Sequence, residues 1–272
     1  MFEKRSDHRM PYITKISAQK NNTERVNIFL DEKYAFSVDL DVLVQHDLKK
    51  GKELDEADII EIQFGDAVKK GFQQAVDYLS YRMRSVKEVT DYLTKKDIPA
   101  PAISEIIHKL KHYKYVNDLE FAEAYVSTHR KTNSKGPSVL KKELKLKGID
   151  DDTIEQALSQ YPNDLQLEEA VKQVLKLVKK EKNRSAKEIE QRIKLQLQRK
   201  GFSFDIIDKA LQEAYDGQEE EKEEEALHYM LEKAKRKVGY DGSFEKKMKV
   251  KQFLYRKGFD LDTIDHVLDK GE

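Results

Sequence analysis

The sequence predicts a mainly α-helical protein in which about four tandem three-helix repeats, stacked into an elongated or curved array, follow a small antiparallel β segment. Charged residues make up 38% of the 272-residue chain, while glycine and proline occur only 11 and 5 times, a balance typical of long helices with charged faces. Strict alternation of apolar and polar residues is confined to the beginning of the chain. One pattern of apolar residues then recurs four times before the end.

The β segment is predicted from residues with a period of two. Apolar residues alternate with polar ones at Val26, Ile28 and Leu30 and, after a charged turn at residues 31–33, at Tyr34, Phe36 and Val38. This pattern predicts a hairpin, with a third strand over residues 12–16. Three short strands bury little surface, so we expect the sheet to pack against the helix that follows.

That helix is predicted to begin after Asp55, which suits an N-cap. Apolar residues continue from there at helical spacing through Ile59, Ile62, Val68, Phe72, Val76 and Leu79. Either Gly65 or Gly71 is expected to interrupt the helix, because glycine is a poor helix former.

The repeats appear when four positions are aligned: Asp97, Gly148, Gly201 and Gly258. Each follows a lysine, and apolar residues recur eight and four positions before it and one, six and ten positions after it. The two earlier positions share one helical face, and the later ones predict a second helix. A further amphipathic run precedes each pair, so each unit has three helices, which must stack on neighbours to bury their apolar faces.

Helix starts repeat as well. Ser85 to Glu88 and Ser185 to Glu188 have the capping-box spacing, and Gly136-Pro137 places proline at the first helical position. These signals divide the chain into an N-terminal segment over residues 1–64 and repeats over residues 65–112, 113–161, 162–216 and 217–272.

Several functional classes are disfavoured. The chain has no cysteine, no phosphate-binding Gly-x-x-x-x-Gly-Lys-Ser/Thr loop and no Gly-x-Ser-x-Gly nucleophile motif. His108 and His112 have a metal-like spacing but no glutamate beside the first, and an exposed helix face explains them better. The acidic run at 150–152 suits a helix start. We therefore expect no catalytic residue, no metal and no cofactor.

No run of eighteen apolar residues occurs and the first ten residues are polar and charged, so we expect a cytoplasmic protein without a membrane partner. Its 51 basic and 51 acidic residues balance, but their distribution is uneven. Residues 109–147 hold ten basic and only four acidic side chains, and residues 219–225 are acidic except for Lys222.

One further group of motifs covers the second repeat: Tyr115-Val116-Asn117-Asp118, Phe121-Ala122, Lys135-Gly136-Pro137, Leu140, Glu143-Leu144 and Lys147-Gly148-Ile149. This order and spacing resembles the RecX family, regulators of the RecA recombinase, although Asn117 stands where the family often has aspartate. Tyr78-Leu79 with Arg82, Arg84 and Ser85 resembles the opening segment of the family, and residues 249–258 resemble its closing segment. The likeness covers about residues 75–268, and Phe36-Ser37-Val38 with the extra length resembles versions from Gram-positive bacteria.

The resemblance implies tandem three-helix repeats and a regulatory, non-enzymatic role in homologous recombination and DNA repair. Members of the family bind RecA filaments in the helical groove and inhibit or remodel them, which suppresses ATP hydrolysis and strand exchange. The implied partners are the RecA filament and single-stranded or double-stranded DNA, with the protein acting as a monomer. Two other classes remain open: an autonomous DNA-binding protein that competes with RecA for DNA, and a helical scaffold for some other protein.

The candidate partner-binding or DNA-binding residues are Arg82, Arg84, Tyr115, Arg130, Lys131, Lys135, Lys141, Lys142, Lys145 and Lys147. The lysines either bind DNA phosphates or acidic RecA loops, or form a solvated helix face. Arg82 and Arg84 either bind phosphate or a carboxylate of the filament, or cap the helix before them through its last carbonyls. Tyr115 either contacts a partner or packs against the following helix.

Overall fold

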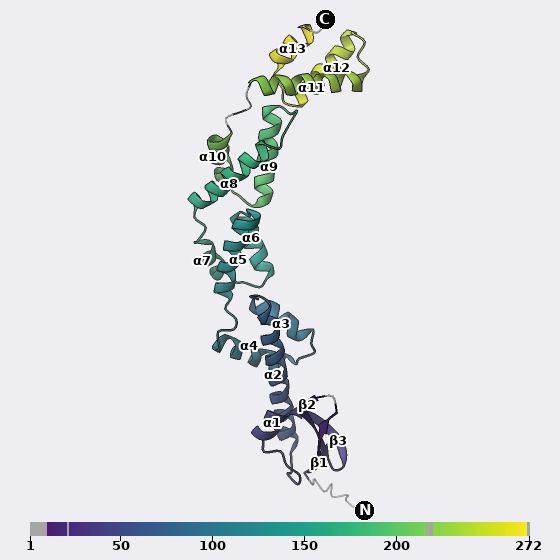
Figure 1. Ribbon diagram of the computed structural model, residues 1–272, viewed down its shortest axis with the longest axis vertical. Coiled ribbons are helices and arrows are strands. Elements are labelled where there is room, and N and C mark those ends of the chain that lie inside the picture. The colour runs from purple at the N-terminus through teal and green to yellow at the C-terminus, as the bar shows by residue number, and fades with distance from the viewer. Residues whose placement is uncertain (1–9, 21, 216, 218–219, 271–272) are drawn as a thin grey trace, which may run out of the picture. The chain divides into compact units, whose positions relative to one another are not determined.

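The computed structural model describes residues 10–20, 22–215, 217 and 220–270 (Figure 1). In this part of the chain, three strands are followed by thirteen helices. The chain divides into two compact units, unit 1 over residues 1–121 and unit 2 over residues 122–272. None of the helices in the described ranges is long and apolar enough to cross a membrane.

The predicted antiparallel sheet is confirmed. It consists of β1 (Ile13–Gln19), β2 (Asn22–Leu30) and β3 (Lys33–Asp39), in that spatial order. The two-residue turn between β2 and β3 places Asp31 and Glu32 at φ values of 47° and 68°. Positive φ at both central residues is typical of the hairpin turns whose twist matches that of the strands.

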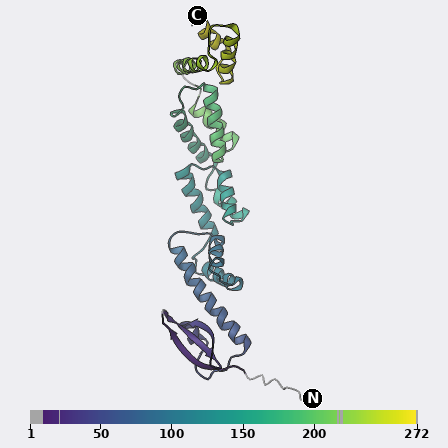
Figure 2. The ribbon, with the colours of Figure 1, turned by 90° about the vertical axis from the view of Figure 1, so that its right-hand side faces the viewer.

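The sheet packs on α1 (Leu40–Gln45) and on the first half of α2 (Glu56–Ser80), as expected from its small size (Figure 2). Ile62 of α2 joins the sheet core and is 1% exposed. Beside it, the buried Asp66 carboxylate accepts two hydrogen bonds from Arg25 of β2, at 3.1 and 2.7 Å, and one from the backbone N–H of Asp39 at 2.8 Å. A paired and fully hydrogen-bonded carboxylate is tolerated at such a buried position.

The expected interruption of α2 is wrong, because the helix runs unbroken through Gly65 and Gly71. A Cβ atom on Gly71 would lie 2.4 Å from the Cδ1 atom of Ile106 in α4 (Ala100–His112). The glycine therefore permits close packing of the two helices and does not end α2. Burial of Val68 and Ala75 stabilises α2 by more than the low helix propensity of Gly71 destabilises it.

Three-helix repeats follow, as predicted. The helices after α2 in unit 1 are α3 (Val86–Thr94) and α4. The boundary between the units falls inside α5 (Asp118–Asn133), after which come α6 (Pro137–Leu146), α7 (Asp151–Leu158), α8 (Asn163–Val178), α9 (Ala186–Lys200), α10 (Phe204–Ala214), α11 (Glu220–Val238), α12 (Phe244–Arg256) and α13 (Leu261–Lys270).

The fourfold register is confirmed at the middle helix of each repeat. Its two predicted core positions are at most 1% exposed in every copy: Val89 and Leu93, Leu140 and Leu144, Ile193 and Leu197, and Val250 and Leu254. The aligned residues after these helices all have positive φ, from 59° at Asp97 to 96° at Gly201. Ser85 and Glu88 close the predicted capping box of α3, and Ser185 accepts the corresponding bond from the Glu188 N–H at 3.1 Å.

Within unit 2, consecutive repeats meet in the same way at what we call repeat junctions. The start of the middle helix of one repeat lies against the carboxyl end of the middle helix of the next. At the first junction, the Gly136 N–H donates to the Lys200 carbonyl at 2.7 Å. At the second, the Ser185 hydroxyl donates to the Lys257 carbonyl at 2.5 Å.

Candidate partner-binding surface

The candidate residues are divided between the two units. Seven lie in unit 2, from the end of α5 to the residue that caps α6: Arg130, Lys131, Lys135, Lys141, Lys142, Lys145 and Lys147. The other three, Arg82, Arg84 and Tyr115, lie in unit 1.

On α6, Leu140 and Leu144 are fully buried, which turns Lys141, Lys142 and Lys145 toward other sides of the helix. Lys141 pairs with Glu155 and Lys145 pairs with Asp151 at 2.7 Å. The hydrogen bond that Lys141 donates to Glu155, together with the negative charge of Glu155, raises the pKa of Lys141. Acidic side chains of α7 therefore neutralise part of this basic face.

Lys135 is held by a carboxylate as well. Its ammonium group lies 2.6 and 2.8 Å from the two carboxylate oxygens of Glu143, to which the Tyr125 hydroxyl also donates at 2.9 Å. Burial alone would raise the pKa of Glu143, but the bonds from Lys135 and Tyr125 hold it below its usual value. Lys147 lies 5.5 Å from the centre of the Tyr125 ring, a cation–π distance.

Lys131 and Lys142 differ from the other lysines of this region. Both are exposed, and neither makes a side-chain hydrogen bond or ion pair within the described ranges. Arg130, beside Lys131, instead lies 5.5 Å over the ring of the buried Tyr161. Lys131 and Lys142 are thus the two candidates in unit 2 whose charge is most available to a partner.

Arg82 has a structural role in unit 1. Its guanidinium donates to both carboxylate oxygens of Glu88, at 3.1 and 3.3 Å, and to the carbonyl of Met83 at 2.9 Å. Glu88 in turn accepts from the Ser85 N–H at 3.2 Å, so Arg82 supports the capping box that begins α3. These contacts place Arg82 at the start of α3, whereas the structural alternative placed it at the end of the helix before, and its binding to a partner stays a prediction.

Arg84 stacks on aromatic rings. Its guanidinium carbon lies 3.9 Å from the centre of the Tyr78 ring, whose other neighbour is the nearly parallel ring of Tyr92 at 4.0 Å. The Arg84 Nε atom is buried and has no hydrogen-bond partner among the described residues. A planar guanidinium on an aromatic face is a stable arrangement that still leaves its other donors for an acceptor.

The ring of Tyr115 packs on Phe72 of α2, whereas the packing alternative named the following helix, and contact with a partner stays a prediction. Tyr115 is 52% exposed, and its ring packs edge-on against Phe72 at 6.1 Å and lies 6.5 Å from Tyr113. Next to it, Asn117 accepts from the Leu119 N–H at 3.0 Å, so asparagine serves as a helix-start residue here. Phe121 is 5% exposed and belongs to the buried hydrophobic residues.

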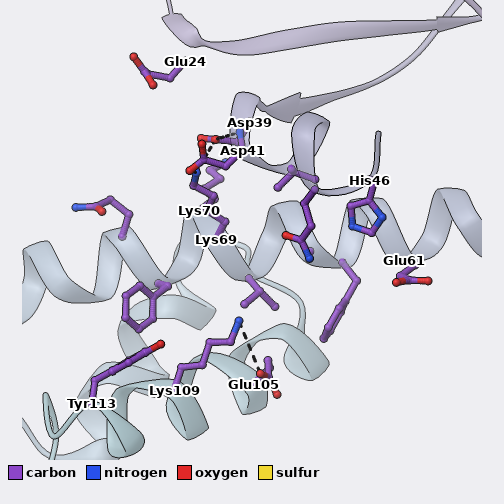
Figure 3. Close-up of a pocket in the computed structure, with 17 residues that line it drawn as sticks. Glu24, Asp39, Asp41, His46, Glu61, Lys69, Lys70, Glu105, Lys109 and Tyr113 are labelled. Atoms are coloured by element: carbon purple, nitrogen blue, oxygen red, sulfur yellow. Dashed lines mark hydrogen bonds and ion pairs between the residues drawn. The ribbon is translucent and has the colours of Figure 1, made fainter. Parts of the chain in front are cut away.

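One feature of unit 1 was not expected from the sequence. It is a hollow of about 740 Å³ with three walls (Figure 3). The end of β3 and α1 form the first wall, the middle of α2 forms the second and α4 forms the third. Lys69 of α2 reaches across to Asp39 at 2.7 Å and to Asp41, while Lys109 pairs with Glu105 at 3.8 Å on the other wall. Burial alone would raise the pKa of Asp39, yet Lys69 holds it below its usual value.

These wall charges are largely satisfied by one another. The hollow has no nucleophile activated by a neighbouring base, and among the described residues no group of three or more histidine, aspartate or glutamate side chains could hold a metal ion. Its mixed lining fits a contact surface better than a reaction centre. The sequence predicted neither α1, whose N-cap is Asp39, nor that α4 would face it.

Comparison with known proteins gives matches along the whole described chain. Residues 11–55 match the RecX N-terminal domain, residues 72–110 the first three-helix domain, residues 117–158 the second, and residues 164–211 and 221–268 both match the third. The regulatory protein RecX of Bacillus pumilus is 95% identical over 97% of this chain and all of its own length, and that of Bacillus subtilis is 64% identical over the same shares.

Solved structures agree. A crystal structure of regulatory protein RecX superposes with a TM-score of 0.61 at 38% identity, covering 73% of this chain and 98% of its own. RecX from Lactobacillus salivarius gives a TM-score of 0.53 at 44% identity, covering 55% of this chain and 97% of its own.

Proposed function

Because this chain belongs to the RecX family of regulatory proteins, we propose that it binds RecA filaments on DNA, in the filament groove, and inhibits or remodels them. RecA would then hydrolyse less ATP and exchange fewer strands. The observation that carries the proposal is the match to every domain of the family in order, with the third domain present twice. Action on RecA would place the protein in the cytoplasm.

A chain of repeats suits a partner that is itself repetitive. Successive repeats can each make a weak contact with successive filament subunits, and after the first contact the others form at a high effective concentration. The regulator needs no catalytic group for this, since it acts on assembly and on the ATPase of its partner.

Inhibition is therefore expected at substoichiometric amounts. A single bound molecule that blocks filament growth affects all subunits that would have added later. The measurement is RecA ATPase activity on single-stranded DNA against increasing amounts of this protein, with filament length followed in parallel. Full inhibition that requires one molecule per RecA, with filament length unchanged, would favour competition for DNA.

The second candidate function is autonomous DNA binding, and Lys131 and Lys142 favour it because their charges are not neutralised by the described parts of the chain. Phosphate contacts from such lysines are non-specific and depend strongly on salt. The same two charges can also meet acidic loops of RecA.

Reversal of both charges, Lys131→Glu with Lys142→Glu, separates these functions. Both side chains are exposed and form no ion pair with another described residue, so stability should change by less than about 0.5 kcal/mol per site. If they bind DNA, affinity for free DNA falls and the salt dependence decreases by about one unit of slope per lost phosphate contact. If they bind RecA, affinity for free DNA stays the same while inhibition of the RecA ATPase weakens.

The matched control is Lys179→Glu with Lys233→Glu, which makes the same charge change at two exposed lysines of unit 2 outside the basic region. Lys141 and Lys145 are unsuitable, because glutamate there would face Glu155 and Asp151. If a folded Lys131/Lys142 variant binds DNA and inhibits RecA like the wild type, these two lysines bind neither DNA nor RecA and serve only the solubility of the protein.

A further inference from the structure

One six-residue motif occurs in both the first and the third repeat, and its arginine has different surroundings in the two. Residues 84–89 are Arg-Ser-Val-Lys-Glu-Val, and residues 184–189 are Arg-Ser-Ala-Lys-Glu-Ile. In both copies the serine caps the helix that follows, which is α3 or α9. The two arginines therefore precede equivalent helix starts, and their surroundings can be compared position by position.

In the third repeat, the arginine is paired with carboxylates of its own chain. The Nε atom of Arg184 lies 2.8 Å from Glu181, and its Nη1 atom lies 2.5 Å from Glu188. Glu181 also pairs with Arg192 at 3.1 Å. A partly buried guanidinium is ordinarily satisfied by charge-assisted hydrogen bonds of this kind.

In the first repeat, no carboxylate of the described chain binds Arg84. The residue at the position of Glu181 is Tyr81, and the carboxylate of Glu88 accepts from Arg82 at 3.1 and 3.3 Å. No nitrogen of the partly buried Arg84 side chain makes a hydrogen bond or ion pair with another described residue. Because a partly buried cation without an anion is unfavourable, this position lacks a group that the third repeat supplies itself.

An aromatic stack holds Arg84 in place instead. Its guanidinium carbon lies 3.9 Å from the centre of the Tyr78 ring, which is itself stacked on the ring of Tyr92. The third repeat has Val178 and Arg192 at these two positions. The stack orients the plane of the guanidinium and uses none of its N–H donors.

Two large, exposed side chains lie close to Arg84 in the sequence. Tyr81 is 83% exposed and Met83 is 50% exposed, and both belong to the short segment between the end of α2 and the start of α3. Tyrosine, methionine and arginine are all more frequent in protein interfaces than on the rest of a protein surface. This segment therefore combines apolar contact area with an oriented cation.

The charge around Arg84 favours a single carboxylate over the phosphates of a nucleic acid. Residues 77–97 contain five basic and four acidic side chains, so this part of the chain is nearly neutral. A nucleic-acid backbone presents a series of phosphates and binds where basic charge accumulates. One guanidinium in neutral surroundings suits one planar carboxylate, which is also what Arg184 binds.

We propose that residues 81–84 are a binding site for an acidic side chain of a protein partner. The carboxylate of the partner accepts hydrogen bonds from the terminal N–H groups of Arg84, as Glu188 does from Arg184. Tyr81 and Met83 contact the apolar groups beside that carboxylate. The inference deepens the proposed function and rests on it for the identity of the partner, the RecA filament.

The test is Arg84→Met, which removes the charge but keeps a long side chain over Tyr78, measured as the dissociation constant for RecA filaments. Binding should weaken tenfold or more, and Arg84→Lys should restore only part of it because lysine lacks the planar fork. The matched control is Arg199→Met, which removes an exposed arginine without a partner among the described residues and should change affinity less than twofold.

Two results of these binding measurements overturn the proposal. One is unchanged binding by Arg84→Met, or an equal loss with Arg199→Met. The other is a parallel loss of affinity for free single-stranded DNA in Arg84→Met, which would make phosphate the ligand.

Thermal unfolding of the free protein tests the site without RecA. Because Arg84 has no anion in the described chain, Arg84→Met should leave the melting temperature unchanged. Arg184→Met leaves Glu181 and Glu188 without their cation and should lower it by several degrees. An equal decrease in both variants means that Arg84 is structural and overturns the proposal.

Failure of the proposed function gives a different result. A wild-type chain that binds no RecA filaments refutes that function, and the melting temperature of Arg84→Met then decides the site. An unchanged value supports a site for the carboxylate of another protein, and a decrease equal to that of Arg184→Met overturns it.

Discussion

Replacement of Leu144 by alanine is expected to lower the free energy of unfolding by about 2 to 5 kcal/mol. Leu144 is 0% exposed in the last turn of α6, so truncation leaves a cavity in addition to the lost apolar burial. The measurement is urea unfolding followed by circular dichroism. Any loss of RecA inhibition in this variant would be a consequence of unfolding.

The same substitution two residues further along provides the control. Leu146 is on the same helix but is 79% exposed, so Leu146→Ala should change stability by less than about 0.5 kcal/mol. If the two variants unfold at the same urea concentration, the core register assigned to α6 is incorrect.

Gly201→Ala is expected to have a comparable effect for a different reason. A left-handed residue with a side chain costs about 1 to 2 kcal/mol, and the overpacked contact with α6 adds about 1 to 3 kcal/mol. The φ of Gly201 is 96°, and the new Cβ would approach the Val139 nitrogen to 2.7 Å. Thermal or urea unfolding of the variant should therefore show a loss of about 2 to 5 kcal/mol.

Gly239→Ala separates the two contributions. Gly239 has a φ of 61°, but no atom lies within 4 Å of the position of its Cβ. This variant should lose only the conformational part, about 1 to 2 kcal/mol. Equal losses at Gly201 and Gly239 would mean that the repeat junction does not require glycine.

The sequence predicted the repeat fold because one apolar register recurs four times. Val89, Leu140, Ile193 and Val250 are each buried, and a helical spacing that repeats so often has little chance of being accidental. Gly71 shows the limit of such reasoning. Its close contact with Ile106 joins residues far apart in the chain, so a local propensity argument predicted a break where packing preserved the helix.

The surface was predicted less completely than the core. Helical spacing correctly predicted that Lys142 and Lys145 lie on the outer side of α6. It could not predict the ion pairs of Lys141 and Lys145, because their partners belong to α7 and the spacing within α6 says nothing about where α7 packs. The ion pair between Arg82 and Glu88 could have been predicted from the sequence, because Glu88 follows Arg82 by six residues and belongs to a capping box that the sequence already indicated. The binding roles of all ten candidates remain predictions.

The uninterrupted course of α2 has a mechanical consequence. Its 25 residues form a rod of about 37 Å, with Ile62 fixed in the sheet core and Ala75 fixed in the core of the first repeat. Because a helix resists bending and twisting, the sheet cannot turn independently of the first repeat unless backbone hydrogen bonds of α2 break. A load applied to the sheet is therefore transmitted to the first repeat, and the two should unfold together as one cooperative unit.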